Sequence, residues 1–100
     1  MSSPELDPVI HPASRLRIVT ALASLPPGQA MAFTHLRERV DMTAGNVSTH
    51  VARLEAARYV DVAKTFEGKR PATHVTLTTA GWNALEHYLT NLNELLGGIG

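Results

Sequence analysis

Residues 34–77 read THLRERVDMTAGNVSTHVARLEAARYVDVAKTFEGKRPATHVTL, and the succession of patterns in this stretch decides the fold. A short helical stripe comes first, and a tight turn at Asp41 and Met42 separates it from a longer one. Two strand-like runs follow, joined by a segment that contains Gly68. This order predicts two short helices joined by a turn and followed by a β-hairpin.

The apolar residues of the helix pair place one face of each helix in a core. Leu36 and Val40 are four residues apart, in a helix that we expect to begin at an N-cap Thr34. The next helix is expected to run from an N-cap at Thr43 to about Arg58. Its buried residues fall at i, i+4 and i+7: Val47, Val51 and Leu54.

The opposite face of this second helix is short, polar and almost free of acidic residues. A face that is merely solvated usually carries Glu and Lys, which form helices more readily than Asn, Ser or Thr. The latter three can instead hydrogen-bond base edges and phosphates. The face therefore predicts contact with duplex DNA through Thr43, Asn46, Ser48, Thr49 and Arg53.

Two strand-like runs follow the helix pair. Residues 59–63 have a β-type composition, and residues 73–77 show a period of two. The segment between them, 67–71, contains the adjacent cations Lys69 and Arg70. We expect these cations to contact backbone phosphates, which adds affinity and positioning rather than sequence choice.

Apolar stripes outside residues 34–77 indicate helix pairing. The helix that opens at His11 and Pro12 carries two overlapping stripes, which implies contact on two sides. The last helix, capped by Thr78, carries apolar residues at spacings of 3, 4, 3 and 4, and these form an a/d seam. We expect both helices to form a homodimer interface through Leu16, Val19, Trp82, Leu85, Leu89, Leu92 and Leu96.

These patterns predict a mainly α-helical α+β fold: a winged helix-turn-helix with an N-terminal helix and a C-terminal dimerisation helix. We place the domain at residues 11–96, after an irregular leader at 1–10 and before a flexible tail at 97–100. A chain of 100 residues suits one such domain, and a domain this small gains from dimerisation.

The composition excludes several classes of function. The chain has 9 basic and 9 acidic residues and no cysteine, which excludes disulfides and thiolate metal sites. Its five histidines lack ligand spacing, and no nucleophile stands beside a base, so we expect no metal, no cofactor and no enzyme activity. No signal peptide or membrane-spanning run is visible, so a cytoplasmic protein without membrane contact is expected.

Three runs resemble winged-helix transcriptional regulators of the MarR/ArsR-like superfamily, in particular a small one-domain DNA-binding group. They are HPASRLRIVTAL from residue 11, VDMTAGNVSTHVARLEAARYVDV from residue 40, and GKRPATHVTLTTAGWNAL from residue 68. The resemblance covers residues 5–96 and implies that residues 43–58 form the recognition helix. It also implies that Lys69 and Arg70 form the wing tip. One position departs from the family: Arg58 stands where Gly is frequent, and Arg adopts a left-handed helix end less readily.

Together these observations predict a sequence-specific regulator that binds double-stranded DNA. As a homodimer it would place two recognition helices in successive major grooves, about 34 Å apart, on a pseudo-palindromic operator. The zero net charge keeps one alternative open, a winged-helix protein–protein interaction module without DNA binding.

Overall fold

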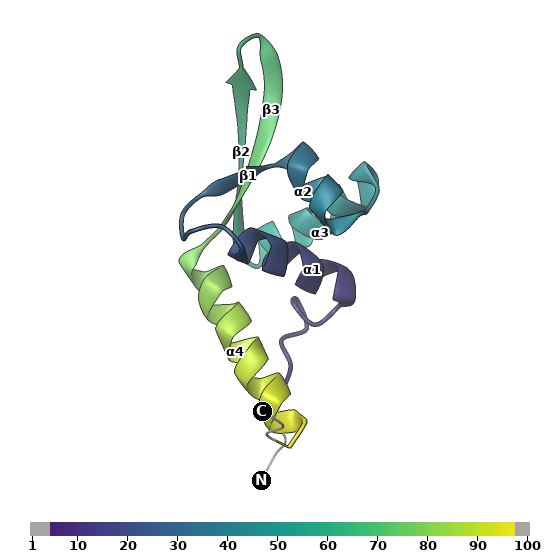
Figure 1. Cartoon of the computed structure of the whole chain (residues 1–100), viewed down its shortest axis with the longest axis vertical. Coiled ribbons are helices and arrows are strands. Elements are labelled where there is room, and N and C mark those ends of the chain that lie inside the picture. Colours follow the sequence, from purple (N-terminus) through teal and green to yellow (C-terminus); the bar gives the residue numbers. More distant parts are fainter. Residues whose placement is uncertain (1–4, 98–100) are drawn as a thin grey trace.

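The computed structural model describes residues 5–97, which form four helices and a three-stranded sheet. The elements in chain order are α1 (Ala13–Ala23), β1 (Ala30–Ala32), α2 (Phe33–Val40), α3 (Ala44–Ala56), β2 (Val60–Glu67), β3 (Arg70–Leu77) and α4 (Thr79–Leu95). The β2–β3 hairpin projects from one end of a helical body and α4 leaves at the other end, so the molecule measures 56 × 25 × 24 Å (Figure 1). The predicted α+β winged-helix fold is confirmed.

The sheet is antiparallel with strand order β1-β3-β2. Its hairpin register runs from Val60 opposite Leu77 to Glu67 opposite Arg70. Both strands are longer than the sequence pattern indicated, and only Gly68 and Lys69 remain in the turn. The far part of the hairpin is exposed on both faces, so backbone pairing continues there without any hydrophobic alternation to signal it.

The core lies between α1, α2, α3 and the base of the sheet. The predicted stripe of α3 is buried, as are Leu36 and Val40 of α2. The fully buried side chains of largest volume are Ile10, Ile18, Leu36, Leu54, Val19, Val47, Val60 and Val75. Burying each such side chain stabilises the fold by about 1.5–3 kcal/mol relative to leaving it exposed.

Two of the three predicted N-cap residues cap their helices. The Thr43 hydroxyl accepts a hydrogen bond from the Asn46 N–H at 3.2 Å, and the Thr78 hydroxyl accepts one from the Gly81 N–H at 3.0 Å. The predicted cap at Thr34 is wrong, because α2 begins at Phe33 with Ala32 as its N-cap and no side-chain cap. Ala32 also pairs with His74 in the sheet, so the strand passes directly into the helix.

Helix α3 ends at Ala56, two residues before the expected limit. A left-handed turn at Arg58 follows it. Arg58 has φ 65°, and its N–H donates to the Glu55 carbonyl while the Tyr59 N–H donates to the Leu54 carbonyl, both at 2.9 Å. This pair of bonds is a Schellman motif, whose left-handed position favours Gly. A Gly at this position, which the resemblance led us to expect, would adopt this conformation without strain.

Replacing Arg58 by Gly is expected to stabilise the protein by about 0.5–1 kcal/mol, because the left-handed strain disappears. Chemical denaturation of both proteins measures the difference. Arg58→Ala is the control, since it removes the guanidinium and keeps the Cβ atom. Equal stability of the Gly and Ala variants would contradict the backbone explanation.

The leader has no helix or strand over residues 5–12, yet it is fastened to the body. Ile10 is fully buried, and the Arg15 Nε donates to the Val9 carbonyl at 2.6 Å. The Tyr59 hydroxyl donates to an oxygen of Asp7. Residues 1–4 and 98–100, including most of the predicted tail, lie outside the described residues.

The bond between Tyr59 and Asp7 makes stability depend on pH in the alkaline range. The hydrogen bond to Asp7, burial and the charge of Asp7 together raise the pKa of Tyr59 to about 12. The folded state thus favours the neutral phenol, and this stabilisation is complete below pH 10 and is lost as the pH rises through about 12.

At neutral pH, Tyr59→Phe is therefore expected to reduce stability by about 1–2 kcal/mol, because a hydrogen bond to a charged acceptor is lost. The difference from the wild type should shrink as the pH rises from 10 to 12. Denaturation of both proteins at several pH values measures this difference in stability. An absorbance titration of the tyrosines follows the ionisation of the Tyr59 phenol. A constant difference across this range would contradict the assignment.

Candidate nucleic-acid interface

The polar face of α3 is exposed along its length. Of the predicted contacts on this helix, Asn46, Ser48, Thr49 and Arg53 are all exposed, and Thr43 is exposed at its N-cap. Two hydroxyls are engaged locally: Thr43 caps the helix, and Thr49 donates to the Gly45 carbonyl at 3.0 Å. Within residues 5–97, the side chains of Asn46, Ser48 and Arg53 have no hydrogen-bond partner, so their polar atoms are available to a ligand.

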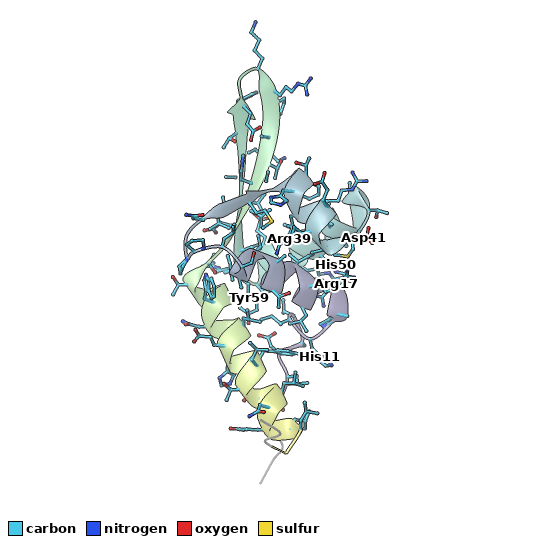
Figure 2. The ribbon with its side chains drawn as sticks, in the orientation of Figure 1. His11, Arg17, Arg39, Asp41, His50 and Tyr59 are labelled. Carbon is cyan, nitrogen blue, oxygen red and sulfur yellow. The ribbon has the colours of Figure 1, made fainter. Side chains whose placement is uncertain are left out.

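The orientation of α3 is set by the turn that precedes it. Asp41 is left-handed with φ 53°, and the Met42 N–H closes the end of α2 on the Arg37 carbonyl at 3.4 Å. From α1, the Arg17 guanidinium donates to the Val40 carbonyl at the end of α2. Figure 2 labels Arg17 and Asp41 beside this turn. These contacts hold α2 and α3 at a fixed angle on the core.

His50 of α3 faces the body rather than the exposed side. Its ring is half-buried, and its Nδ1 lies 3.4 Å from a terminal nitrogen of Arg15 on α1. The same guanidinium reaches the leader through Val9. His50 therefore joins α3 to α1 and the leader, and it takes no place on the exposed face.

The hairpin carries the two predicted cations at its tip. Lys69 lies in the turn, Arg70 begins β3, and both are exposed. Across the two strands, His74 Nε2 lies 3.5 Å from a carboxylate oxygen of Glu67. Neither Lys69 nor Arg70 has an ion-pair partner within the described part of the chain, so the tip presents two exposed cations beside the exposed carboxylate of Glu67.

A groove of about 260 Å³ separates α3 from the hairpin. It is lined by Phe33, Ser48, Val51, Ala52, Glu55, Val62, Lys64 and Thr73. Of these, only Ser48 was among the residues predicted from sequence. Lys64 was missed because its sequence neighbourhood carries no helical or turn motif. The sheet register sets Lys64 opposite Thr73, and this pairing is what places Lys64 at the groove.

The predicted dimer residues separate into three groups. Val19 and Leu85 are buried inside the subunit, 0% and 5% exposed, so they present no surface to a partner and their assignment to an interface is corrected. Leu89 and Leu96 are 50% and 57% exposed. The remaining three are half-buried: Leu16, Trp82 and Leu92.

The physical reason lies in how α4 packs against its own subunit. Its buried residues Gly81, Leu85 and Tyr88 form one stripe at i, i+4 and i+7. Tyr88 is 3% exposed, and its hydroxyl lies 3.2 Å from Nδ1 of His11. The a/d seam predicted from sequence therefore straddles two faces of α4, and only part of it is available at the surface.

Within residues 5–97, the structure brings together no group of three or more His, Cys, Asp or Glu side chains able to hold a metal ion. None of the described helices has the length and apolar character needed to cross a membrane.

Comparison with known proteins identifies the family. Residues 14–96 match the model of the winged helix DNA-binding domain. The chain is 25% identical over 91 residues to an uncharacterized protein of Methanocaldococcus jannaschii, covering 91% of this chain and 96% of that protein.

Solved structures agree with this match. A transcriptional regulator homologue from Pyrococcus horikoshii superposes with a TM-score of 0.80 at 25% identity, covering 91% of this chain and 87% of the other. The DNA-binding protein BpsR of Bordetella bronchiseptica shares the fold with a TM-score of 0.72 at 17% identity, over 92% of this chain and 67% of that one. These structures share the fold of this chain, and the family model that it matches is that of a DNA-binding domain. The chain belongs to the winged helix DNA-binding domain family.

Proposed function

We propose that this DNA-binding regulator recognises a specific duplex sequence as a homodimer. In this arrangement α3 of each subunit enters a major groove, and the hairpin, which acts as the wing, contacts the flanking backbone. The two half-sites lie about one helical turn apart, so the operator is pseudo-palindromic.

The exposed face of α3 is the observation that supports sequence recognition. Asn46, Ser48 and Arg53 present unpaired polar atoms, while the opposite stripe of the helix fixes it in the core. An Asn amide can pair with adenine and an Arg guanidinium with guanine through two hydrogen bonds each. We therefore assign base contacts to Asn46 and Arg53, and base or phosphate contacts to Thr43, Ser48 and Thr49.

The wing tip supplies affinity without sequence choice. Lys69 and Arg70 extend beyond α3 on the hairpin, and in the described residues neither forms an ion pair, although Glu67 lies opposite Arg70 in the register. A cation at such a place neutralises a phosphate and releases counterions. Each contact contributes about 0.9 to the slope of log affinity against log salt.

The exposed apolar side chains of α4 support the homodimer. Leu89, Leu95 and Leu96 are each about half exposed at the end of the helix, and Leu16, Trp82 and Leu92 are half-buried. An apolar cluster of this kind on a small domain is stabilised by contact with a second apolar surface. We place the two-fold axis along this part of α4.

Selection of bound sequences from a random duplex pool tests the proposal directly. We expect recovered sites with two-fold symmetry and half-sites one turn apart. In titrations of a recovered site, Asn46→Ala or Arg53→Ala should each reduce discrimination by about 1–3 kcal/mol at one base pair. The double variant Lys69→Ala with Arg70→Ala should weaken binding to all sequences and lower the salt slope by about 2.

The exposed residue Glu86 on α4 offers a matched control, because Glu86→Gln changes a charge away from the proposed DNA surface. This variant should leave the recovered DNA sequence and the slope of log affinity against log salt unchanged. Failure to retain any duplex at low salt would overturn the proposal and favour a protein-interaction module instead.

A further inference from the structure

The hairpin has two chemically different faces. Alternate residues of a strand point to opposite sides, and cross-strand partners share a side. On β2, Val60 is buried and Val62 is half-buried, so this row faces the body. The row continues outward along the strand with Lys64 and Phe66, beyond the core. The register sets Thr73 and Pro71 opposite them.

The row that faces the body also faces α3. Val62, Lys64 and Thr73 line one wall of the 260 Å³ groove, and Ser48 and Ala52 of α3 line the other. Both walls are open to the outside, and Ser48 and Ala52 are on the exposed part of α3. The groove thus connects the recognition helix to the wing.

Phe66 has no role in the subunit's core. Its side chain is 73% exposed, the most exposed of the large apolar residues in the described chain. It lies two residues beyond Lys64 on the same face, at a distance of about 7 Å along the strand. An aromatic ring at this place extends the wall of the groove outward with an apolar surface next to a cation.

We propose that this groove holds one sugar–phosphate strand of the bound duplex. The Lys64 ammonium contacts a phosphate, the Ser48 and Thr73 hydroxyls donate to neighbouring oxygens, and the Phe66 ring packs against the deoxyribose beyond. This inference rests on the proposed function, and it adds contacts on the inner face of the wing to those of its tip. The occupant is a DNA backbone because the wall combines a cation, small hydroxyls and an apolar ring, and carries no base-reading amide.

Glu55 limits where the strand can lie. It is exposed, lines the same groove, and sits seven residues after Ser48 on α3, or about 10 Å along the axis. A carboxylate repels phosphate, so the strand occupies the end of the groove near Ser48 and Lys64. Neutralising Lys64 and neutralising Glu55 should therefore have opposite effects on the affinity for DNA.

Three variants test the inference by the sign and the salt dependence of their effects. The probe is a labelled duplex of about 24 base pairs that carries a site recovered from the random pool. Lys64→Gln should weaken binding and lower the salt slope by about 0.9, because one phosphate contact is lost. Glu55→Gln should strengthen binding about two- to fivefold, because a repulsive charge is removed.

Phe66→Thr completes the set, because Thr keeps a strand-forming residue while removing the ring. We expect binding to weaken about fivefold with the salt slope unchanged, since an apolar contact releases no counterion. Ala63→Thr is the matched control, as Ala63 is exposed on the outer face of the same strand. It should leave affinity unchanged.

The outcomes separate this inference from the proposed function. If Lys69→Ala weakens binding while the changes at Lys64, Glu55 and Phe66 have no effect, the groove is not a backbone site although the protein binds DNA. If Phe66→Thr alters only the oligomeric state, the ring belongs to a contact between copies of the chain and the inference is overturned. If the wild type binds no duplex, the proposed function itself fails.

Discussion

Gly81→Ala will lose about 3 kcal/mol of stability or more, because the added methyl group has no space. A Cβ atom at Gly81 would lie 2.2 Å from the Tyr59 carbonyl oxygen and 2.6 Å from Cδ1 of Leu77. The oxygen belongs to the backbone, and it already accepts a hydrogen bond from the Thr78 N–H at 3.0 Å. To relieve the clash, the start of α4 must move away from Tyr59 and Leu77.

Thermal unfolding measures this effect, and a loss of this size lowers the Tm of a domain of 100 residues by about 10–20 °C. Gly45→Ala is the matched control, since Gly45 is also helical and nothing lies within 4 Å of an added Cβ atom. That variant should gain about 0.5–1 kcal/mol from helix propensity. A Gly81→Ala protein as stable as the wild type would show that α4 docks differently.

The double variant Leu89→Glu with Leu96→Glu is expected to be a monomer that binds its operator at least about 100-fold more weakly. The two leucines are half exposed, so the change leaves the subunit core intact. In the proposed dimer each buried leucine contributes about 1.5–3 kcal/mol, and a carboxylate in its place would be desolvated without a partner. Losing the dimer removes the effective concentration that the second half-site provides, which is worth 10²–10⁴ in affinity.

Sedimentation analysis gives the oligomeric state, and titration of the operator duplex gives the affinity. Thr90→Glu is the control, because Thr90 is an exposed neighbour on α4 and the change introduces the same charge. It should remain dimeric and bind DNA normally. A dimeric double variant would place the interface on another surface and contradict the assignment to α4.

The order of the elements could be predicted from sequence because each has a local cause. Val47, Val51 and Leu54 follow helical spacing, and all three are buried. Thr43 and Thr78 cap the helices that follow them, because a hydroxyl needs only the next turn of its own helix. The winged-helix order of these elements followed from the same local patterns.

Errors arose where a distant segment decides the outcome. Thr34 has a good capping side chain, but pairing between Ala32 and β3 carries the chain into the helix earlier. Ile10 lies in a stretch without periodic pattern, and its complete burial is set by the folded body rather than by its sequence neighbours.

For the candidate site, the sequence located the polar face of α3 and the cations at the wing tip, since exposure follows from helical spacing and from the turn. Lys64, Phe66 and Glu55 could not be grouped from sequence. Only the packing of α3 brings Glu55 and Lys64 to one groove, and only the strand register places Phe66 beyond Lys64 on the same face.

By itself, the sequence determined which helices and strands form, since spacing, caps and turn residues act within a few residues. Only the tertiary structure decided which leucines of α4 remain at the surface, why position 81 must be Gly, and which face of the wing meets α3. Those features depend on side chains and carbonyls that are far apart in the chain and close together in space.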